Sequence, residues 1–345
     1  MANIYGRSFT KTELMKRVGD ISQIAGARRS TLESGKAKGV TAVDVKTGSG
    51  LNFTVLPDRG MDIAWADYKG ISMGHISKAG IVSPEFYDSN GVEFLRSFYA
   101  GLLTTCGLTY MGAACIDEGK PLGLHGRASN LPADDVCIIN EWAGDEFIMK
   151  VRGRIRESAV FGENITLTRE IEARLGENKI TIRDEVENCG FDRQPLMLLY
   201  HFNFGFPVLD DATQLILPEG TVRARDREAE KGIDACKTFN GPLHGYAEQV
   251  FYHDPAAGSD GKVTAALFNK ALGTAGLSVS LTYNKKQLPY LIEWKQTDEG
   301  DYVVGLEPAT WYPEGRSEAR KRGELLFIEP GEIRKTELEI KVCEG

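Results

Sequence analysis

From about Val40 to the C-terminus, the chain is a succession of short β-type segments separated by turn residues. Each segment is rich in Val, Ile, Thr and aromatic residues, and several show the strict alternation of a half-buried strand, as in Leu277 to Leu281 and Thr336 to Val342. Gly, Asn and Asp lie between the segments, and no helical pattern alternates with them. Roughly fifteen such strands without intervening helices predict an all-β protein with a large antiparallel two-sheet sandwich.

The N-terminal residues have a different pattern. Thr10 and Glu13 have the spacing of a capping box, and the apolar residues that follow recur at helical intervals, which predicts a short N-terminal helix. No change in composition marks a second domain later in the chain. We therefore expect residues 1–39 to form a helical or extended segment packed on the main domain, and residues 40–345 to form a single β-sandwich domain.

Composition limits the class of partner. Hydrophobic residues make up 42% of the chain and charged residues 26%, which is typical of a globular protein with a sizeable core. The net charge of -8 disfavours a nucleic-acid or anionic-membrane surface, so a small molecule is the expected partner. The N-terminus lacks the apolar stretch of a signal peptide, and the six cysteines include no Cys-x-x-Cys pair. These features predict a cytoplasmic protein with reduced thiols and no membrane partner.

His201 is the most unusual ionisable residue, because it lies in the middle of an apolar run from Leu196 to Leu209. Burying a histidine is costly unless a partner holds it or a reaction uses it. A lone histidine in such a strand is more often a core residue bonded to a backbone carbonyl. Asn203, two residues on, points to the same face, and this polar pair favours a functional site.

Glu307 is the second candidate, because it follows an apolar strand and precedes Pro308. Desolvation there would raise its pKa from about 4.3 toward neutrality, as a general base requires. An ion pair with Arg316 or Arg320 is an equally supported alternative.

His125 is the third candidate, in the segment GLHGR. The flanking Gly123 and Gly126 let the backbone approach a ligand closely, and Arg127 adds a planar cationic donor. A tight turn with an exposed side chain is the competing interpretation.

Other chemistries have weaker support. His125, His201 and Glu307 offer metal-ligand types, but no short-range pair such as His-x-His accompanies them, so no metal site is predicted. The chain has no GxxxxGK[ST] loop, no strand-to-helix GxGxxG and no GxSxG elbow, so neither a nucleotide cofactor nor a serine nucleophile is implied. The alternating charges of Arg223 to Lys231 are typical of a solvated surface and receive no functional role.

Taken in order, three motifs resemble the galactose mutarotase-like superfamily, and most closely its uncharacterised aldose 1-epimerase-like branch. GLHGR resembles the family segment whose histidine contacts sugar hydroxyls, YHFNFG resembles the strand with the general-acid histidine, and GLEPATWYPEG resembles the loop with the general-base glutamate. Tyr200 stands before His201 where true galactose mutarotases usually have Asn, so the catalytic pair is implied more firmly than the sugar. The resemblance implies the fold called a supersandwich.

The function implied is an isomerase that interconverts the anomers of a free sugar without a cofactor. Glu307 would be the base and a protonated His201 the acid. The residues that the resemblance places around the sugar are His125, Arg127, Asn203, Glu248, Arg59, Arg96 and Trp311. For Arg59 and Arg96, a structural salt bridge is the more common fate. Two alternatives stay open: a non-catalytic carbohydrate-binding sandwich and a metal-dependent sugar isomerase.

Overall fold

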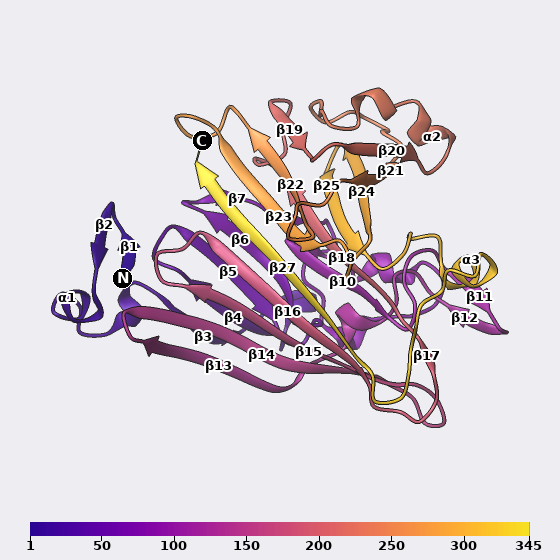
Figure 1. The fold of residues 1–345 in the computed structure, drawn as a ribbon, viewed down its shortest axis with the longest axis horizontal. Helices are drawn as coiled ribbons and strands as arrows, with labels where there is room; N and C mark the ends of the chain where they lie inside the picture. Colours follow the sequence, from indigo (N-terminus) through magenta and orange to yellow (C-terminus); the bar gives the residue numbers. More distant parts are fainter. Residues whose placement is uncertain (345) are drawn as a thin grey trace.

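The computed structural model describes residues 1–344 and confirms an antiparallel β-sandwich. Two large sheets lie face to face and make up most of the molecule (Figure 1). The strands of the larger sheet are β3 (Gly26–Thr31), β4 (Thr41–Lys46), β5 (Leu51–Leu56), β6 (Asp62–Tyr68), β7 (Ile71–Ser72), β10 (Leu103–Leu108), β18 (Met197–Gly205), β20 (Gly220–Ala224), β21 (Gln249–Pro255), β24 (Tyr290–Asp298) and β25 (Asp301–Ala309). Their order is β20-β21-β24-β25-β18-β10-β6-β5-β4-β3, and β7 pairs with β6.

The smaller sheet has the order β13-β14-β15-β16-β27-β23-β22-β19. These strands are β13 (Asp134–Ala143), β14 (Glu146–Ser158), β15 (Asn164–Arg174), β16 (Lys179–Asn188), β19 (Thr213–Ile216), β22 (Lys262–Asn269), β23 (Leu277–Asn284) and β27 (Ile333–Glu344). The C-terminal strand β27, in yellow, crosses the middle of this sheet between β16 and β23 (Figure 1).

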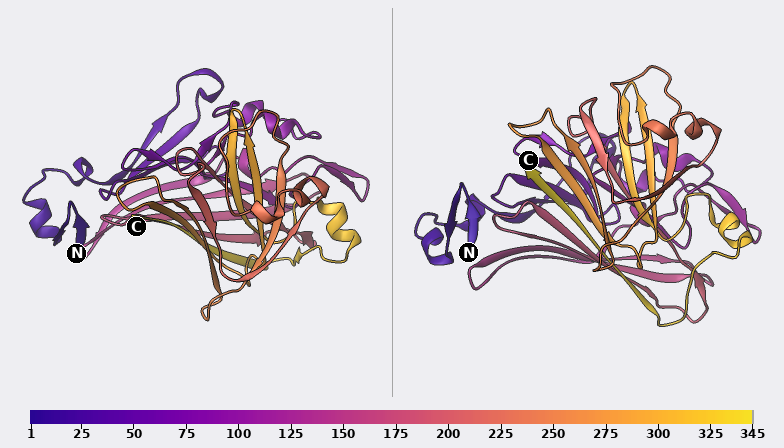
Figure 2. Two further views of the ribbon diagram at one scale, coloured as in Figure 1. Left: turned by 90° about the horizontal axis from the view of Figure 1, so that it is seen from above. Right: turned by 45° about the horizontal axis from the view of Figure 1, so that its top comes forward.

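Short elements decorate the two sheets. The remaining strands are β1 (Ala2–Ile4), β2 (Arg7–Phe9), β8 (His75–Ile76), β9 (Ala100–Gly101), β11 (Cys115–Asp117), β12 (Lys120–Leu122), β17 (Gln194–Pro195) and β26 (Phe327–Ile328). The helices are α1 (Lys11–Met15), α2 (Arg227–Glu230), α3 (Arg316–Lys321) and the 3₁₀ turns η1 (Ile21–Gln23), η2 (Gly35–Ala37), η3 (Pro84–Phe86), η4 (Glu93–Arg96), η5 (Ala128–Asn130) and η6 (Ile233–Ala235). Figure 2 shows the indigo N-terminal hairpin and α1 at the opposite end of the molecule from the yellow α3. Among residues 1–344, no helix is long and apolar enough to cross a membrane.

The N-terminal helix is confirmed, and it is short. The Thr10 hydroxyl accepts from the Glu13 backbone, and the Glu13 carboxylate accepts from the Thr10 backbone, so the capping box is complete. Within residues 1–39, strand β3 pairs with β4 along its whole length. The larger sheet therefore begins inside the segment that the sequence separated from the main domain.

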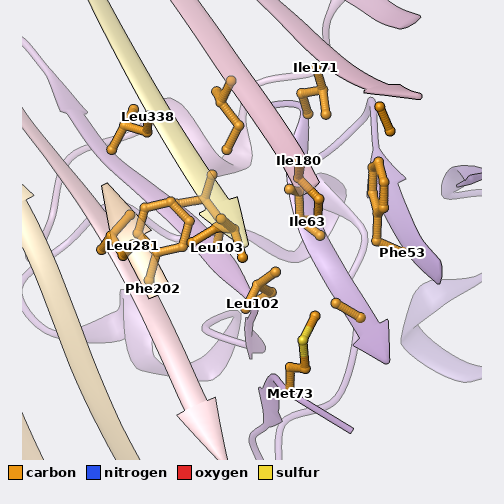
Figure 3. Close-up of a cluster of buried hydrophobic side chains, with 14 of the residues drawn as sticks. Phe53, Ile63, Met73, Leu102, Leu103, Ile171, Ile180, Phe202, Leu281 and Leu338 are labelled. Atoms are coloured by element: carbon orange, nitrogen blue, oxygen red, sulfur yellow. The ribbon is translucent and has the colours of Figure 1, made fainter. Parts of the chain in front are cut away.

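The core lies between the two sheets and is built from alternate residues of both (Figure 3). The larger sheet and the segments beside it contribute Phe53, Ile63, Met73, Leu102, Leu103 and Phe202, and the smaller sheet contributes Ile171, Ile180, Leu281 and Leu338. Strand β18 is buried along its whole length, as its continuous apolar run predicted. Because side chains alternate across a strand, Phe202 faces this core and His201 faces the opposite side of the sheet.

One buried ionic network joins the sheets. Arg169 on β15 binds Asp184 on β16 through two nitrogen–oxygen contacts of 2.9 and 2.7 Å, and it reaches across to Asp62 on β6 at 2.9 Å. The Tyr200 hydroxyl also donates to Asp184, at 2.7 Å. All three charged side chains are fully buried, so each depends on the others for charge compensation.

Candidate active site

A cavity of about 330 Å³ lies on the side of the larger sheet that faces away from the core. Its floor comes from strands β18, β24 and β25, and its walls come from loops before β10, before η5 and before β21. The lining residues include Phe94, Phe98, His125, His201, Arg225, Glu248, Ile292, Trp294 and Glu307. The structure therefore brings together four of the residues that the sequence singled out: His125, His201, Glu248 and Glu307.

His201 and Glu307 are in direct contact on neighbouring strands. The register that pairs Phe202 with Leu306 places His201 of β18 beside Glu307 of β25. Nε2 of His201 lies 3.1 Å from Oε1 of Glu307, without the angle of a hydrogen bond. The two side chains are 5% and 3% exposed, so they meet in a region from which water is almost excluded.

Burial shifts the two pKa values in opposite directions. Desolvation lowers the pKa of His201 well below its ordinary value, and the nearby His125 lowers it further. Desolvation raises the pKa of Glu307 well above its ordinary value, and the Glu248 carboxylate adds to this effect. Both shifts favour the uncharged forms of the pair, which are a protonated Glu307 and a neutral His201. This direction differs from the protonated His201 that the resemblance implied, because burial favours two uncharged groups over two separate ions.

Gly305 has no side chain, and this leaves room for His201 and Glu307. A Cβ atom at this position would lie 2.6 Å from Oε1 of Glu307 and 3.0 Å from Cε1 of His201. Both distances are shorter than an ordinary contact, so a larger residue at this point of β25 would force the side chains of Glu307 and His201 to shift.

His125 lines the cavity beside His201. Its backbone adopts a left-handed conformation with φ of 59°, and its ring centroid lies 5.8 Å from that of His201. Desolvation lowers the pKa of His125 to about 4, so the imidazole is neutral near pH 7. Its Nδ1 is buried and makes no hydrogen bond to a described residue, which leaves it available to a ligand.

Glu248 is held in place by two residues that the sequence did not suggest. Trp294 donates its indole Nε1–H to Oε2 of Glu248 at 2.8 Å, and Arg225 lies 3.0 Å from Oε1. Arg225 belongs to the charged stretch Arg223 to Lys231; it is exposed, as expected of a solvated surface, and it also lines the cavity, which the sequence did not suggest. The ring of Trp294 also packs against His201, at 5.3 Å between centroids.

Five other residues proposed from the sequence do not line the cavity. Arg59 is completely buried, and its guanidinium donates to three backbone carbonyls rather than to a carboxylate. Trp311 is 2% exposed and bonds Glu324, so it has no free ring face. Asn203 donates to the backbone carbonyl of His201 at 2.8 Å.

The last two are surface arginines. Arg96 is exposed and pairs with Glu93 on the same turn η4. Arg127 lines a separate, more polar cavity together with Tyr110, Arg316 and other residues. These positions give the two arginines no contact with the first cavity.

Two alternatives for the site can be compared with this geometry. The pairing of Glu307 with Arg316 or Arg320 is not found, because both arginines bind Asp117. Within residues 1–344, His125, His201 and Glu307 are not among the His, Cys and carboxylate groups that lie close enough to share a metal ion.

Comparison with known proteins agrees with the fold. A family model described as a domain of unknown function, DUF4432, matches residues 37–342. No curated protein matches the chain. Among solved structures, a protein from Klebsiella pneumoniae that is named as a candidate aldose 1-epimerase is 27% identical, with a TM-score of 0.86 over 92% of this chain and 83% of its own.

Two more distant structures show the same fold. A galactose mutarotase-like protein from Clostridium acetobutylicum is 14% identical, with a TM-score of 0.64 over 94% of this chain and 100% of its own. Galactose 1-epimerase from Lactobacillus acidophilus is 13% identical, with a TM-score of 0.54 over 93% of this chain and 99% of its own. The galactose mutarotase-like fold that the motifs implied is confirmed.

Proposed function

The chain belongs to the DUF4432 family and has the galactose mutarotase-like fold, and we propose that it is an aldose 1-epimerase that interconverts the anomers of a free sugar. The observation that carries the proposal is the buried contact between His201 and Glu307 at the floor of a cavity. The volume of about 330 Å³ is at the lower end of the range for small-molecule sites. The name of the Klebsiella protein, a candidate aldose 1-epimerase, supports the same reaction class.

The reaction needs one base and one acid that act together. Glu307 as a carboxylate removes the proton from the anomeric hydroxyl, while the imidazolium of His201 delivers a proton to the ring oxygen. The ring opens, the carbonyl end rotates, and closure with the roles reversed gives the other anomer. After ring opening, the proton is on Glu307 and His201 is neutral.

This open-chain protonation state is also the one that the free protein favours. The pair therefore has to transfer its proton from Glu307 to His201 before it can open a ring. The proton can pass directly from Oε1 of Glu307 to Nε2 of His201, because the two atoms are 3.1 Å apart. A small rotation of the imidazole would give the angle of a hydrogen bond. Sugar hydroxyls that donate to the Glu307 carboxylate favour the ion pair, because hydrogen bonds to a charged form stabilise it. We propose that substrate binding prepares the catalytic state in this way.

The other polar residues of the cavity orient the sugar. Neutral His125 offers both a donor and an acceptor to hydroxyl groups. Glu248 accepts hydrogen bonds, and Trp294 and Arg225 hold it in position. The apolar walls, among them Phe98 and the Trp294 ring, are suited to the C–H faces of a sugar.

Exchange spectroscopy by NMR on a panel of aldoses tests the proposal. We expect the wild-type protein to accelerate anomer exchange, and His201→Ala or Glu307→Gln to reduce the rate by about 10² to 10⁴. The chain contains a matched control, because His244 and Glu299 form a similar pair at 3.0 Å on the surface. Substituting His244 and Glu299 in the same way should leave exchange unchanged.

The outcomes separate the proposal from its alternative. Sugar binding without faster exchange in the wild-type protein would identify a non-catalytic carbohydrate-binding sandwich. Equal rates in the wild-type protein and in both His201 and Glu307 variants would remove the proposed catalytic roles.

A further inference from the structure

A second group of buried ionisable side chains lies on the other face of strand β24 from the cavity. Ile292 and Trp294 line the cavity, so alternation along the strand turns Glu293 to the opposite face. There Glu293 meets His253 of β21 and Cys236, which follows η6. Their exposed fractions are 0%, 6% and 4%. His253 lies in the buried part of strand β21.

The three side chains present their ligand atoms to one another. The Cys236 sulfur, a His253 nitrogen and a Glu293 oxygen all lie within 4.8 Å of each other. The closest pair is Nε2 of His253 and Oε2 of Glu293, at 2.8 Å. Around a tetrahedral zinc ion with bonds of about 2.0 to 2.3 Å, ligand atoms are roughly 3.3 to 3.8 Å apart. The three ligand atoms, which are at most 4.8 Å apart, are therefore close to that spacing.

Part of this group lacks a bonding partner. Oε1 of Glu293 is buried and makes no hydrogen bond to a described residue. Lys295 is the nearby cation, but its ammonium group donates to the carbonyls of Ala235 and Thr238 at 3.0 and 2.6 Å. No ion pair joins Lys295 to Glu293 in the part of the chain that the structure describes. One oxygen of this buried carboxylate therefore has no partner, while the other contacts His253.

We propose that Cys236, His253 and Glu293 bind one zinc ion. Three protein ligands that combine a thiolate, an imidazole and a carboxylate are typical of Zn²⁺, and a small external ligand can complete the tetrahedron. Magnesium and calcium are excluded by the thiolate, since these ions prefer oxygen ligands.

Burial raises the pKa of the Cys236 thiol and of Glu293 in the metal-free protein, so both groups favour their protonated forms there. The ion displaces protons from these groups and supplies the positive charge that both anions need. The metal joins η6 to strands β21 and β24. It thereby fastens the segment that follows Arg225, one wall residue of the sugar cavity, and it takes no part in the proposed reaction.

Metal content and a cobalt spectrum test the site. Protein is stripped with a chelator and titrated with Zn²⁺ while its melting temperature is followed, and a second sample is loaded with Co²⁺. We expect a saturable rise in melting temperature with one zinc ion per chain, and a thiolate-to-cobalt charge-transfer band in the near ultraviolet. Cys236→Ser should remove the band and weaken zinc binding by about 100-fold or more. The matched control is Cys343→Ser, because Cys343 is free and exposed.

The same experiments can overturn the inference. Wild-type protein that shows no saturable zinc binding and no cobalt–thiolate band would refute it, even if the Cys236 variant fails to fold. Unchanged zinc affinity in folded Cys236→Ser or His253→Gln protein would do the same. Anomer exchange is measured separately, so a failure of this site leaves the proposed reaction untouched.

Discussion

Replacing Glu307 by glutamine separates the chemical role of this side chain from its structural role. Glutamine has nearly the shape of a protonated carboxylic acid, and burial already raises the pKa of Glu307 well above its ordinary value. The neutral amide therefore fits the same place but can neither accept nor deliver a proton. We expect anomer exchange to fall by about 10² to 10⁴ while the protein remains folded.

The stability of this variant should depend on pH in a defined direction. The folded-state pKa of Glu307 lies above the ordinary value of 4.5 that applies to the unfolded chain. The stability that protonated Glu307 contributes is therefore complete below about pH 4.5 and is lost as the pH rises through the folded-state pKa. Between these two pKa values, the free energy of unfolding of the wild-type protein falls by about 1.4 kcal/mol per pH unit relative to that of Glu307→Gln, because glutamine cannot ionise. The side chain is 3% exposed, so solvent screening reduces this figure little.

Urea unfolding of both proteins at several pH values between about 5 and 8 measures this difference. His201 shifts in the opposite sense, and it is present in both proteins, so its contribution largely cancels. The control is Glu299→Gln, in the exposed pair with His244. A stability difference between wild type and Glu307→Gln that does not change with pH would refute the reasoning about burial. Exchange within about threefold of the wild type would refute the reasoning about proton transfer.

Three further substitutions test other parts of the structure. Arg169→Met should destabilise the fold by about 3 to 5 kcal/mol, because it leaves two aspartates buried without a counter-charge; a loss below 1 kcal/mol in urea unfolding would contradict this. Gly305→Ala should slow anomer exchange by about 100-fold, since the added methyl group displaces Glu307, and near-normal exchange would show that the pair tolerates the shift. Trp294→Phe should weaken sugar binding by about 1 kcal/mol in calorimetry through the lost bond to Glu248, and unchanged affinity would contradict that role.

The fold could be predicted because the sequence repeats one local signal many times. Alternation in segments such as Leu277 to Leu281 defines a strand and also the face that it buries. Strand β3, which lies before residue 40, gave little signal because it has the sequence GARRST and lies at the edge of its sheet. An edge strand with two exposed arginines carries little of the apolar pattern that identifies a strand.

The site was predictable only where an ionisable residue broke an apolar pattern. His201 and Glu307 each interrupt a strand that is otherwise apolar, and their contact then depends on the pairing of β18 with β25, which local sequence does not specify. Trp294 gave no such signal, because an aromatic residue in an alternating strand is common. Whether its side chain lies in the core or in a cavity depends on how the sheets pack. Arg225 was not predicted, because alternating charges are typical of a solvated surface. In the structure, the segment after β20 places the Arg225 side chain beside Glu248.

The cavity also has a consequence for the kind of ligand that it can hold. Nδ1 of His125, Nδ1 of His201 and Oε1 of Glu307 are buried and make no hydrogen bond to a described residue. A buried polar atom without a partner costs about 1 to 3 kcal/mol, so ligand hydroxyl groups that pair with such atoms recover about that much each. An analogue that lacks one of these hydroxyls leaves one atom unpaired again and should bind about 5 to 150 times more weakly. Neutral His125 can donate or accept a hydrogen bond, so we expect the cavity to select ligands by the positions of their hydroxyl groups.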